Sequence, residues 1–176
     1  MSSKVKKELV EWIKSIAFAL IVAGLLMLFA RPSIVNGESM LPTFQSGDLV
    51  LVERITQFFS EPERGDIVVA LTDLRTEEGD KKNLIKRVIA LPGDSIVIED
   101  FKVYVNGKEL QEDYLFENST GGSFEGIVPA GHVFVLGDNR YNSNDSRSDE
   151  VGYIPMDKLK GRVYFRLYPF KSMGLI

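Results

Sequence analysis

The stretch "NLIKRVIALPGD", residues Asn83–Asp94, has the composition of a β-strand that ends in a turn. Branched apolar side chains fill its centre, Leu84–Leu91, without the period of a helix, and the turn formers Pro92-Gly93-Asp94 close it. Similar runs bounded by turn formers recur along the chain, at Asp48–Val52, Asp66–Leu71, Ser95–Asp100, Lys102–Gly107, His132–Gly137 and Gly161–Tyr168. Their regular spacing predicts a mainly β domain, an all-β sandwich or barrel-like body.

Two stretches do not fit this strand pattern. Lys108–Pro129 is polar and contains several glycines, so we expect an excursion from the sheet over residues 108–129. Asp138–Glu150 has a single apolar side chain, Tyr141, in 13 residues. Long loops in compact domains are often functional or else mobile, so this second stretch is a candidate for function.

The N-terminal region predicts a membrane anchor. Ser15–Ala30 is a run of 16 uncharged residues, and a helix over residues 12–30 with only Lys14 charged would span roughly 28 Å. Lysines concentrate before this run and Arg31 alone follows it closely, which places residues 1–11 in the cytoplasm and residues 31–176 outside. A buried core helix is disfavoured because the run has no polar face, and a cleaved signal peptide because the run ends in a poor cleavage site.

Composition excludes several functions. The chain contains no cysteine, which removes disulfides, thiol catalysis and cysteine metal sites. Its only histidine, His132, excludes a multi-histidine metal site and alternates into a strand as a packed or edge residue. The net charge is −4, and the part after residue 30 is more acidic still, which disfavours nucleic acid as a partner.

Lys86 is the basic side chain with an unusual position. In an alternating strand it shares a face with Leu84, Val88 and Ala90, while Arg87 lies on the other face. Desolvation lowers the pKa of a buried lysine, which can then act as a neutral base toward a serine hydroxyl. An arginine cannot do so, because it stays protonated. The alternative from this segment alone is an ordinary strand whose lysine reaches solvent.

Two further segments hold candidate residues, and each has an ordinary alternative. Ser39 lies in "NGESMLPTF", where Gly and Pro are also consistent with a simple turn. The polar loop that begins at Asp138 is also consistent with a solvated turn containing an Asp145–Arg147 ion pair.

Taken together, three segments are far more specific than any of them alone. "SMLPT" (Ser39–Thr43), "KRVIALPGD" (Lys86–Asp94) and "GDNRYNSNDSR" (Gly137–Arg147) follow one another behind a single N-terminal anchor. They resemble the three signature boxes of type I signal peptidases, membrane-bound Ser/Lys endopeptidases that remove signal peptides from exported proteins. "RGDIVV" (Arg64–Val69) is similar to a further structural box of that family. The resemblance covers essentially the whole chain and is to the shorter, Gram-positive form.

The resemblance implies a role for each matching residue. It implies an all-β catalytic domain outside the cytoplasmic membrane, near the protein export machinery, with precursor proteins as substrates and neither metal nor cofactor. The nucleophile would be Ser39 and the general base Lys86, with Ser143 orienting the lysine, Asp145 and Arg147 supporting the site, and Ser146 and Asp138 completing the third box.

Two positions depart from the family pattern. Gly37 stands where some relatives carry a serine that assists the oxyanion hole, so the Ser39 backbone N–H would have to do more of that work. Ala90 stands where glycine is common, and its added methyl group is small.

The resemblance also implies shallow apolar pockets for small substrate side chains at the first and third positions before the cut. Candidates for their lining are Val35, Met40, Phe44 and Ile85. An overlapping set of apolar residues either presses into the lipid interface or packs in the core: Met40, Leu41, Phe44, Phe58 and Phe59.

Three functional classes therefore stand before the structure is considered. The first is a membrane-anchored serine endopeptidase that works through an acyl-enzyme. The second is a catalytically silent, membrane-tethered binding or assembly module on the same scaffold. The third is an autoproteolytic Ser/Lys repressor of the SOS-response type, which would need a DNA-binding helical domain where this chain has an apolar run.

Overall fold

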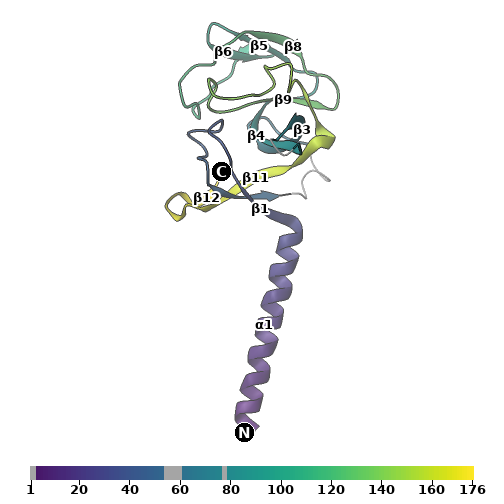
Figure 1. Cartoon of the computed structure of the whole chain (residues 1–176), viewed down its shortest axis with the longest axis vertical. Helices are drawn as coiled ribbons and strands as arrows, with labels where there is room; N and C mark the ends of the chain where they lie inside the picture. Colours follow the sequence, from purple (N-terminus) through teal and green to yellow (C-terminus); the bar gives the residue numbers. More distant parts are fainter. Residues whose placement is uncertain (1–2, 54–60, 77–78) are drawn as a thin grey trace.

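The computed structural model describes residues 3–53, 61–76 and 79–176, apart from the side chains of residues 3–6, 23 and 25–29. One helix, α1 (Ser3–Phe29), extends as a single rod away from the β body that follows it (Figure 1). No helix within the described ranges meets the length and apolarity that a bilayer crossing requires.

The helix differs at both ends from the predicted span of residues 12–30. It begins at Ser3 because the first residues include strong helix formers such as Lys, Glu and Leu. It ends at Phe29, and Ala30 already opens strand β1, where it pairs with Glu53. Pro32 favours this ending, because the residue before a proline avoids helical geometry.

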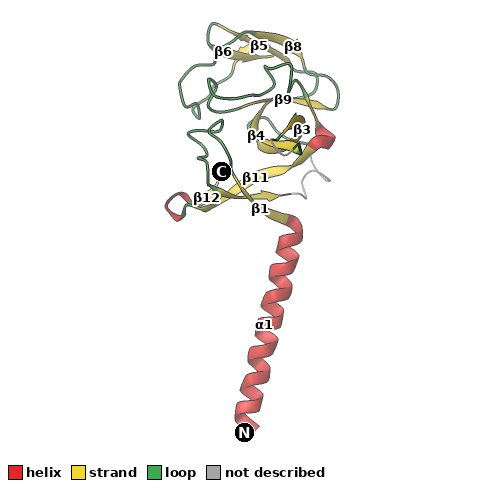
Figure 2. Cartoon of the chain, viewed as in Figure 1, coloured by secondary structure: helices red, strands yellow, loops and turns green. Residues whose placement is uncertain are grey.

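The mainly β prediction is confirmed, and all the pairings are antiparallel (Figure 2). The larger sheet has the order β1-β2-β11-β3-β4-β9-β10, with β12 beside β11. Its strands are β1 (Ala30–Ile34), β2 (Leu49–Glu53), β3 (Ile67–Arg75), β4 (Lys81–Ala90), β9 (His132–Leu136), β10 (Ile154–Pro155), β11 (Leu159–Tyr168) and β12 (Gly174–Leu175). Short 3₁₀ turns η1 (Met156–Lys158) and η2 (Phe170–Ser172) flank β11. Every run that the sequence predicted as a strand forms one, with ends shifted by a few residues.

A smaller sheet covers the end of the body that lies away from α1 (Figure 1). Its order is β7-β6-β5-β8, from β5 (Ser95–Glu99), β6 (Lys102–Val105), β7 (Lys108–Glu109) and β8 (Phe124–Ile127). Asn106 and Gly107 connect β6 to β7 with φ of 53° and 73°, the geometry of a tight hairpin turn.

Residues 108–129, which we expected to form an excursion from the sheet, contain the short strands β7 and β8 of the smaller sheet. Residues 110–123 between these two strands form no strand. β8 was not predicted because its exposed residues are Glu125 and Ile127 and its half-buried ones Phe124 and Gly126, so neither face is consistently apolar. Asp138–Glu150 forms no strand, as predicted.

The apolar core holds the two sheets together and places β4 at their junction. One buried cluster joins β4 and β9 of the larger sheet to β5 and β6 of the smaller, and includes Ile89, Phe134 and Ile98. A second cluster packs the segment after β1 onto β2 and β3 through Met40 and Phe44. Strand β4 is therefore central, with β3 on one side and β9 on the other.

Candidate active site

Ser39 and Lys86, which are 47 residues apart in sequence, meet at the centre of the site. Lys86 Nζ lies 2.7 Å from Ser39 Oγ and donates a second hydrogen bond of 3.0 Å to the Ile85 carbonyl. The Lys86 side chain is only 2% exposed, between buried Leu84 and Val88 on its strand. The interpretation of Lys86 as an ordinary solvent-facing strand lysine is therefore wrong.

Burial changes the chemistry of the Lys86 amine. Desolvation lowers the pKa of Lys86 from 10.5 to about 8, while the carboxylates of Asp145 and Asp138 act in the opposite direction and Lys82 lowers it further. A substantial fraction of the amine is then neutral near pH 8, and its lone pair can accept the hydroxyl proton of Ser39.

The segment that carries Ser39 is fixed by the polar loop 138–150. Asn139 N–H donates to the Ser39 carbonyl at 3.0 Å, and the Asn139 side chain donates to the Glu38 carbonyl at 3.2 Å. Asn142 in turn donates to the Glu38 carboxylate at 3.2 Å. Sequence reasoning gave Asn139 and Asn142 no role, although both lie inside the third box.

Asp145 and Arg147 form a buried pair beneath the loop. Arg147 donates two hydrogen bonds to Asp145, from Nε to Oδ1 at 2.8 Å and from Nη2 to Oδ2 at 2.9 Å. Asp145 also accepts the Gly137 N–H at 3.1 Å and is 1% exposed, so the interpretation as a solvated turn is wrong. Ser146 is buried too, and its hydroxyl accepts the Val135 N–H at 3.0 Å.

Asp138 ties the loop to β4. It accepts Arg87 Nε at 2.8 Å and Arg87 Nη2 at 2.7 Å, and the Thr43 hydroxyl also donates to it. Arg87 and Lys86 therefore leave the same strand for different partners, one a carboxylate and the other a serine. Arg87 and Thr43 were missed from the sequence, because nothing in the local pattern indicates that they meet Asp138.

The structure does not bring the Ser143 hydroxyl to Lys86. Ser143 Oγ is buried without a hydrogen-bond partner in the described part of the chain. It packs against Gly137, where a Cβ would lie 2.3 Å from Ser143 Oγ and 2.4 Å from the Ser39 carbonyl oxygen. The predicted contact between Ser143 and the lysine is thus absent from this structure.

A cleft of about 520 Å³ opens in front of Ser39 and Lys86. Three of the predicted pocket residues, Val35, Met40 and Ile85, line it. Phe44 does not line the cleft, which corrects the prediction: its side chain is fully buried in the core, where the guanidinium of Arg166 lies 5.0 Å from its ring.

Of the apolar residues considered for the lipid interface, Met40 and Phe44 pack in the core instead. Leu41 is half-buried. Phe58 and Phe59 lie outside the described residues.

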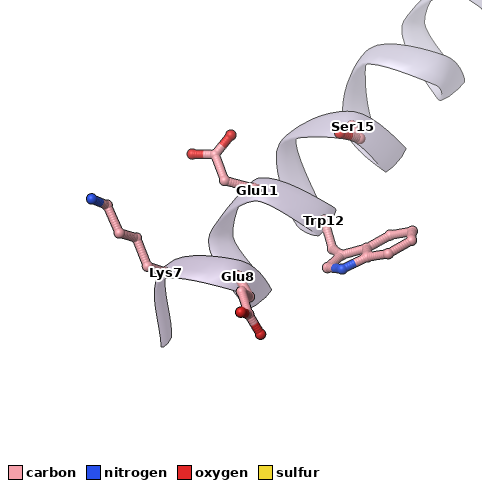
Figure 3. Close-up of a pocket in the computed structure, with 5 residues that line it drawn as sticks. All are labelled: Lys7, Glu8, Glu11, Trp12 and Ser15. Carbon is pink, nitrogen blue, oxygen red and sulfur yellow. The ribbon is translucent and has the colours of Figure 1, made fainter. Parts of the chain in front are cut away.

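Two other places in the described chain do not gather catalytic groups. His132 is half-buried, and its Nδ1 lies 2.9 Å from the Ala130 carbonyl, as expected of a packed or edge residue. A hollow on α1 is lined by Lys7, Glu8, Glu11, Trp12 and Ser15, but Figure 3 shows Lys7 and Trp12 pointing to opposite sides of the helix.

The chain is also similar in sequence to known proteins. The family model described as "Signal peptidase, peptidase S26" matches residues 9–168. This chain belongs to that family. It is therefore a serine endopeptidase, a hydrolase.

Similar relatives of this S26 peptidase extend over nearly its whole length. Signal peptidase I of Bacillus licheniformis is 36% identical, with 98% of this chain and 95% of the relative covered. A probable signal peptidase I of a Synechocystis strain is 40% identical over 89% of this chain and 81% of its own. A crystal structure of signal peptidase I from Enterococcus faecalis is 30% identical and covers 58% of this chain and 97% of its own, with a TM-score of 0.49.

Proposed function

We propose that this S26 peptidase removes N-terminal signal peptides from exported precursor proteins, with Ser39 as nucleophile and Lys86 as general base. The observation that carries the proposal is the 2.7 Å approach of Lys86 Nζ to Ser39 Oγ at a buried lysine. The names of its relatives supply the substrate class.

In the proposed mechanism the neutral Lys86 amine takes the Ser39 hydroxyl proton as Oγ attacks the scissile carbonyl carbon. The tetrahedral intermediate collapses to an ester on Ser39, and the proton on Lys86 passes to the leaving amine. Lys86 then removes a proton from water, which hydrolyses the ester and regenerates Ser39. The Ile85 carbonyl, which accepts a hydrogen bond from Lys86 Nζ at 3.0 Å, helps to orient the amine during these steps.

The developing oxyanion needs hydrogen-bond donors in a fixed position. Gly37 offers no side-chain donor, and its backbone N–H already faces Ser46 Oγ at 3.3 Å. We therefore assign the Ser39 backbone N–H as the donor. The peptide unit that contains this N–H is held in place because the Glu38 carbonyl accepts a hydrogen bond from the Asn139 side chain at 3.2 Å.

We also propose that α1 anchors the enzyme in the cytoplasmic membrane by a single pass. Support comes from the uncharged run Ser15–Ala30 and from the lysines that precede it, which favour a cytoplasmic N-terminus and an extracytoplasmic β body. The lipid bilayer and the export machinery would then be its surroundings, and precursor proteins rather than nucleic acid its partners. The body is joined to α1 directly at Ala30, so the catalytic cleft would stay near the outer leaflet.

The test is cleavage of a purified signal-peptide-bearing precursor by the full-length protein in detergent. Ser39→Ala and Lys86→Ala should each abolish cleavage, while His132→Ala should retain most of it. Mass spectrometry should find the cut after a small residue, with another small residue two positions earlier. A folded His132→Ala protein without activity would replace the Ser/Lys assignment by a Ser/His one.

A further inference from the structure

A segment outside the three boxes makes contacts at two places with the polar loop 138–150, called the catalytic loop from here on. This segment, residues 110–123, connects β7 to β8, the two edge strands of the smaller sheet. Glu112 and Arg140 form an ion pair whose side chains are 6% and 1% exposed. Further along the segment, the Gly121 carbonyl accepts Arg147 Nη1 at 2.8 Å.

Arg140 connects Glu112 to the backbone of the catalytic loop. Its Nη1 donates to Glu112 Oε2 at 3.0 Å, its Nη2 to Glu112 Oε1, and its Nε to the Gly137 carbonyl at 2.9 Å. The Thr120 hydroxyl accepts a further hydrogen bond from Nη1. The N–H groups of this buried guanidinium are thus shared: Nη1 and Nη2 bind the 110–123 segment, and Nε binds the Gly137 carbonyl.

A displacement of Gly137 would change the positions of Ser39 and of the groups around Lys86. Its Cα lies against the Ser39 carbonyl oxygen and Ser143 Oγ, so closely that a Cβ there would come within 2.4 Å of both. Its N–H donates to Asp145, which acts electrostatically on Lys86. The position of Gly137 therefore sets the spacing between the nucleophile segment and the groups around the lysine.

A second contact of the segment reaches the strand of the lysine. Tyr114 donates its hydroxyl to Glu112 Oε1 at 2.8 Å, and its ring lies 3.9 Å from the guanidinium carbon of Arg87. Arg87 is the partner of Asp138. Burial and the neighbouring Glu112 both raise the pKa of Tyr114, so the hydroxyl stays protonated and remains a donor.

We propose that Glu112 is a positioning residue for catalysis, which acts through Arg140 and the Gly137 carbonyl to hold the catalytic loop against Ser39. The inference rests on the proposed Ser39/Lys86 function and adds to it a residue that lies in none of the three boxes. Glu112 is not among the residues that line the cleft in front of Ser39. Its loss therefore alters the turnover of bound precursor more than the binding of precursor.

The experiment compares kcat, KM and Tm of full-length variants in detergent on one precursor. Glu112→Gln should lower kcat about tenfold or more while KM changes less than about twofold, because a buried cation loses its counter-charge and the loop loses its register. Glu109→Gln breaks the exposed Lys102–Glu109 pair of the same sheet and should leave kcat unchanged. Val103→Ala opens the core of that sheet without touching the loop and supplies a matched loss of Tm.

A double variant separates positioning from stability. Glu112→Gln with Arg140→Met leaves no unpaired buried charge, so Tm should recover toward the parent value, yet kcat should stay low because nothing holds the Gly137 carbonyl. If the double variant has the kcat of the parent, the proposal is overturned, and this holds even if Glu112→Gln alone does not fold. Equal losses of kcat in Glu112→Gln and Val103→Ala at matched Tm would overturn it as well.

Ser39→Ala and Lys86→Ala run beside these variants keep the two proposals apart. If either of them still cleaves, the proposed function fails whatever Glu112 does. If both are inactive while Glu112→Gln cleaves at the parent kcat, the failure belongs to the positioning role alone.

Discussion

Lys86 is the residue at which folding and chemistry conflict. A charged amine in this buried position lacks water, which is why its pKa is lowered from 10.5 to about 8. Between pH 8 and 10.5 the unfolded chain binds a proton that the folded chain does not, so stability from this group increases with pH across that window. Below about pH 8 both states are protonated, and the folded state keeps a buried charge that costs about 3 kcal/mol.

Replacing Lys86 by methionine should therefore give a protein that is inactive and more stable. We expect Lys86→Met to raise the free energy of unfolding at pH 7 by up to about 3 kcal/mol, because the chain length is kept and the charge is removed. Thermal unfolding in detergent at pH 7, 9 and 10.5 measures this. The gain over the parent should decrease as pH rises through the window, and a gain that does not depend on pH would contradict burial of the charge as its cause.

Lys86→Arg tests whether the side chain serves as a base or only as a positive charge. Guanidinium stays protonated at any working pH, so Lys86→Arg should be as inactive as Lys86→Ala. In the parent enzyme kcat/KM should fall about tenfold for each pH unit below about pH 8, because Lys86 becomes protonated there. Substantial turnover by a folded Lys86→Arg protein would remove the general-base role.

At the scale of elements, the catalytic loop is placed by its contact with the Ser39 segment. Two stretches that are about a hundred residues apart meet through Asn139 and Glu38, and Gly137 lies close to the Ser39 carbonyl. That carbonyl is part of the backbone and cannot move aside as a flexible side chain could. This close approach requires glycine for space and not for an unusual φ, since Gly137 is absent from the positive-φ residues of the described chain.

Gly137→Ala should therefore separate the loop from the nucleophile segment. The added Cβ would lie 2.4 Å from the Ser39 carbonyl oxygen, so one backbone must shift, and we expect kcat to fall by about a hundredfold or more. Gly174→Ala in β12 is the matched control, because a Cβ there meets nothing within 4 Å. Precursor cleavage and Tm are measured for both, and near-parental activity of Gly137→Ala would mean that this contact does not position the site.

At the scale of the whole molecule, α1 and the smaller sheet lie at opposite ends of the body (Figure 1). Large apolar side chains along α1 are exposed, including Trp12, Phe18 and Leu20. An isolated helix that exposes such side chains in water is unfavourable, which agrees with the proposed membrane anchor.

The proposed topology gives a direct expectation for intact cells. Protease added to spheroplasts should degrade the β body and leave a fragment of about the first 30 residues protected, since the short N-terminus would lie inside. Detergent lysis before protease treatment is the control. Complete protection of the β body in intact spheroplasts would reverse the orientation.

The sequence by itself determined the class of fold and the family, and it led to the proposed reacting pair. Strand composition is local, so runs such as Leu84–Leu91 were predictable, and a lysine inside an apolar strand was one candidate for an unusual base. The order of the three boxes then singled out Ser39 and Lys86 among many serines and lysines.

Only the tertiary structure decided how the site is built around that pair. The 2.7 Å approach of Lys86 to Ser39, the turn of Phe44 into the core, and the link from Glu112 through Arg140 to Gly137 all join residues far apart in sequence. Such contacts depend on strand register and on the packing of one sheet against another. Neither strand register nor sheet packing produces a periodic pattern in the sequence. A glutamate in a polar stretch looks the same whether it faces water or a buried arginine.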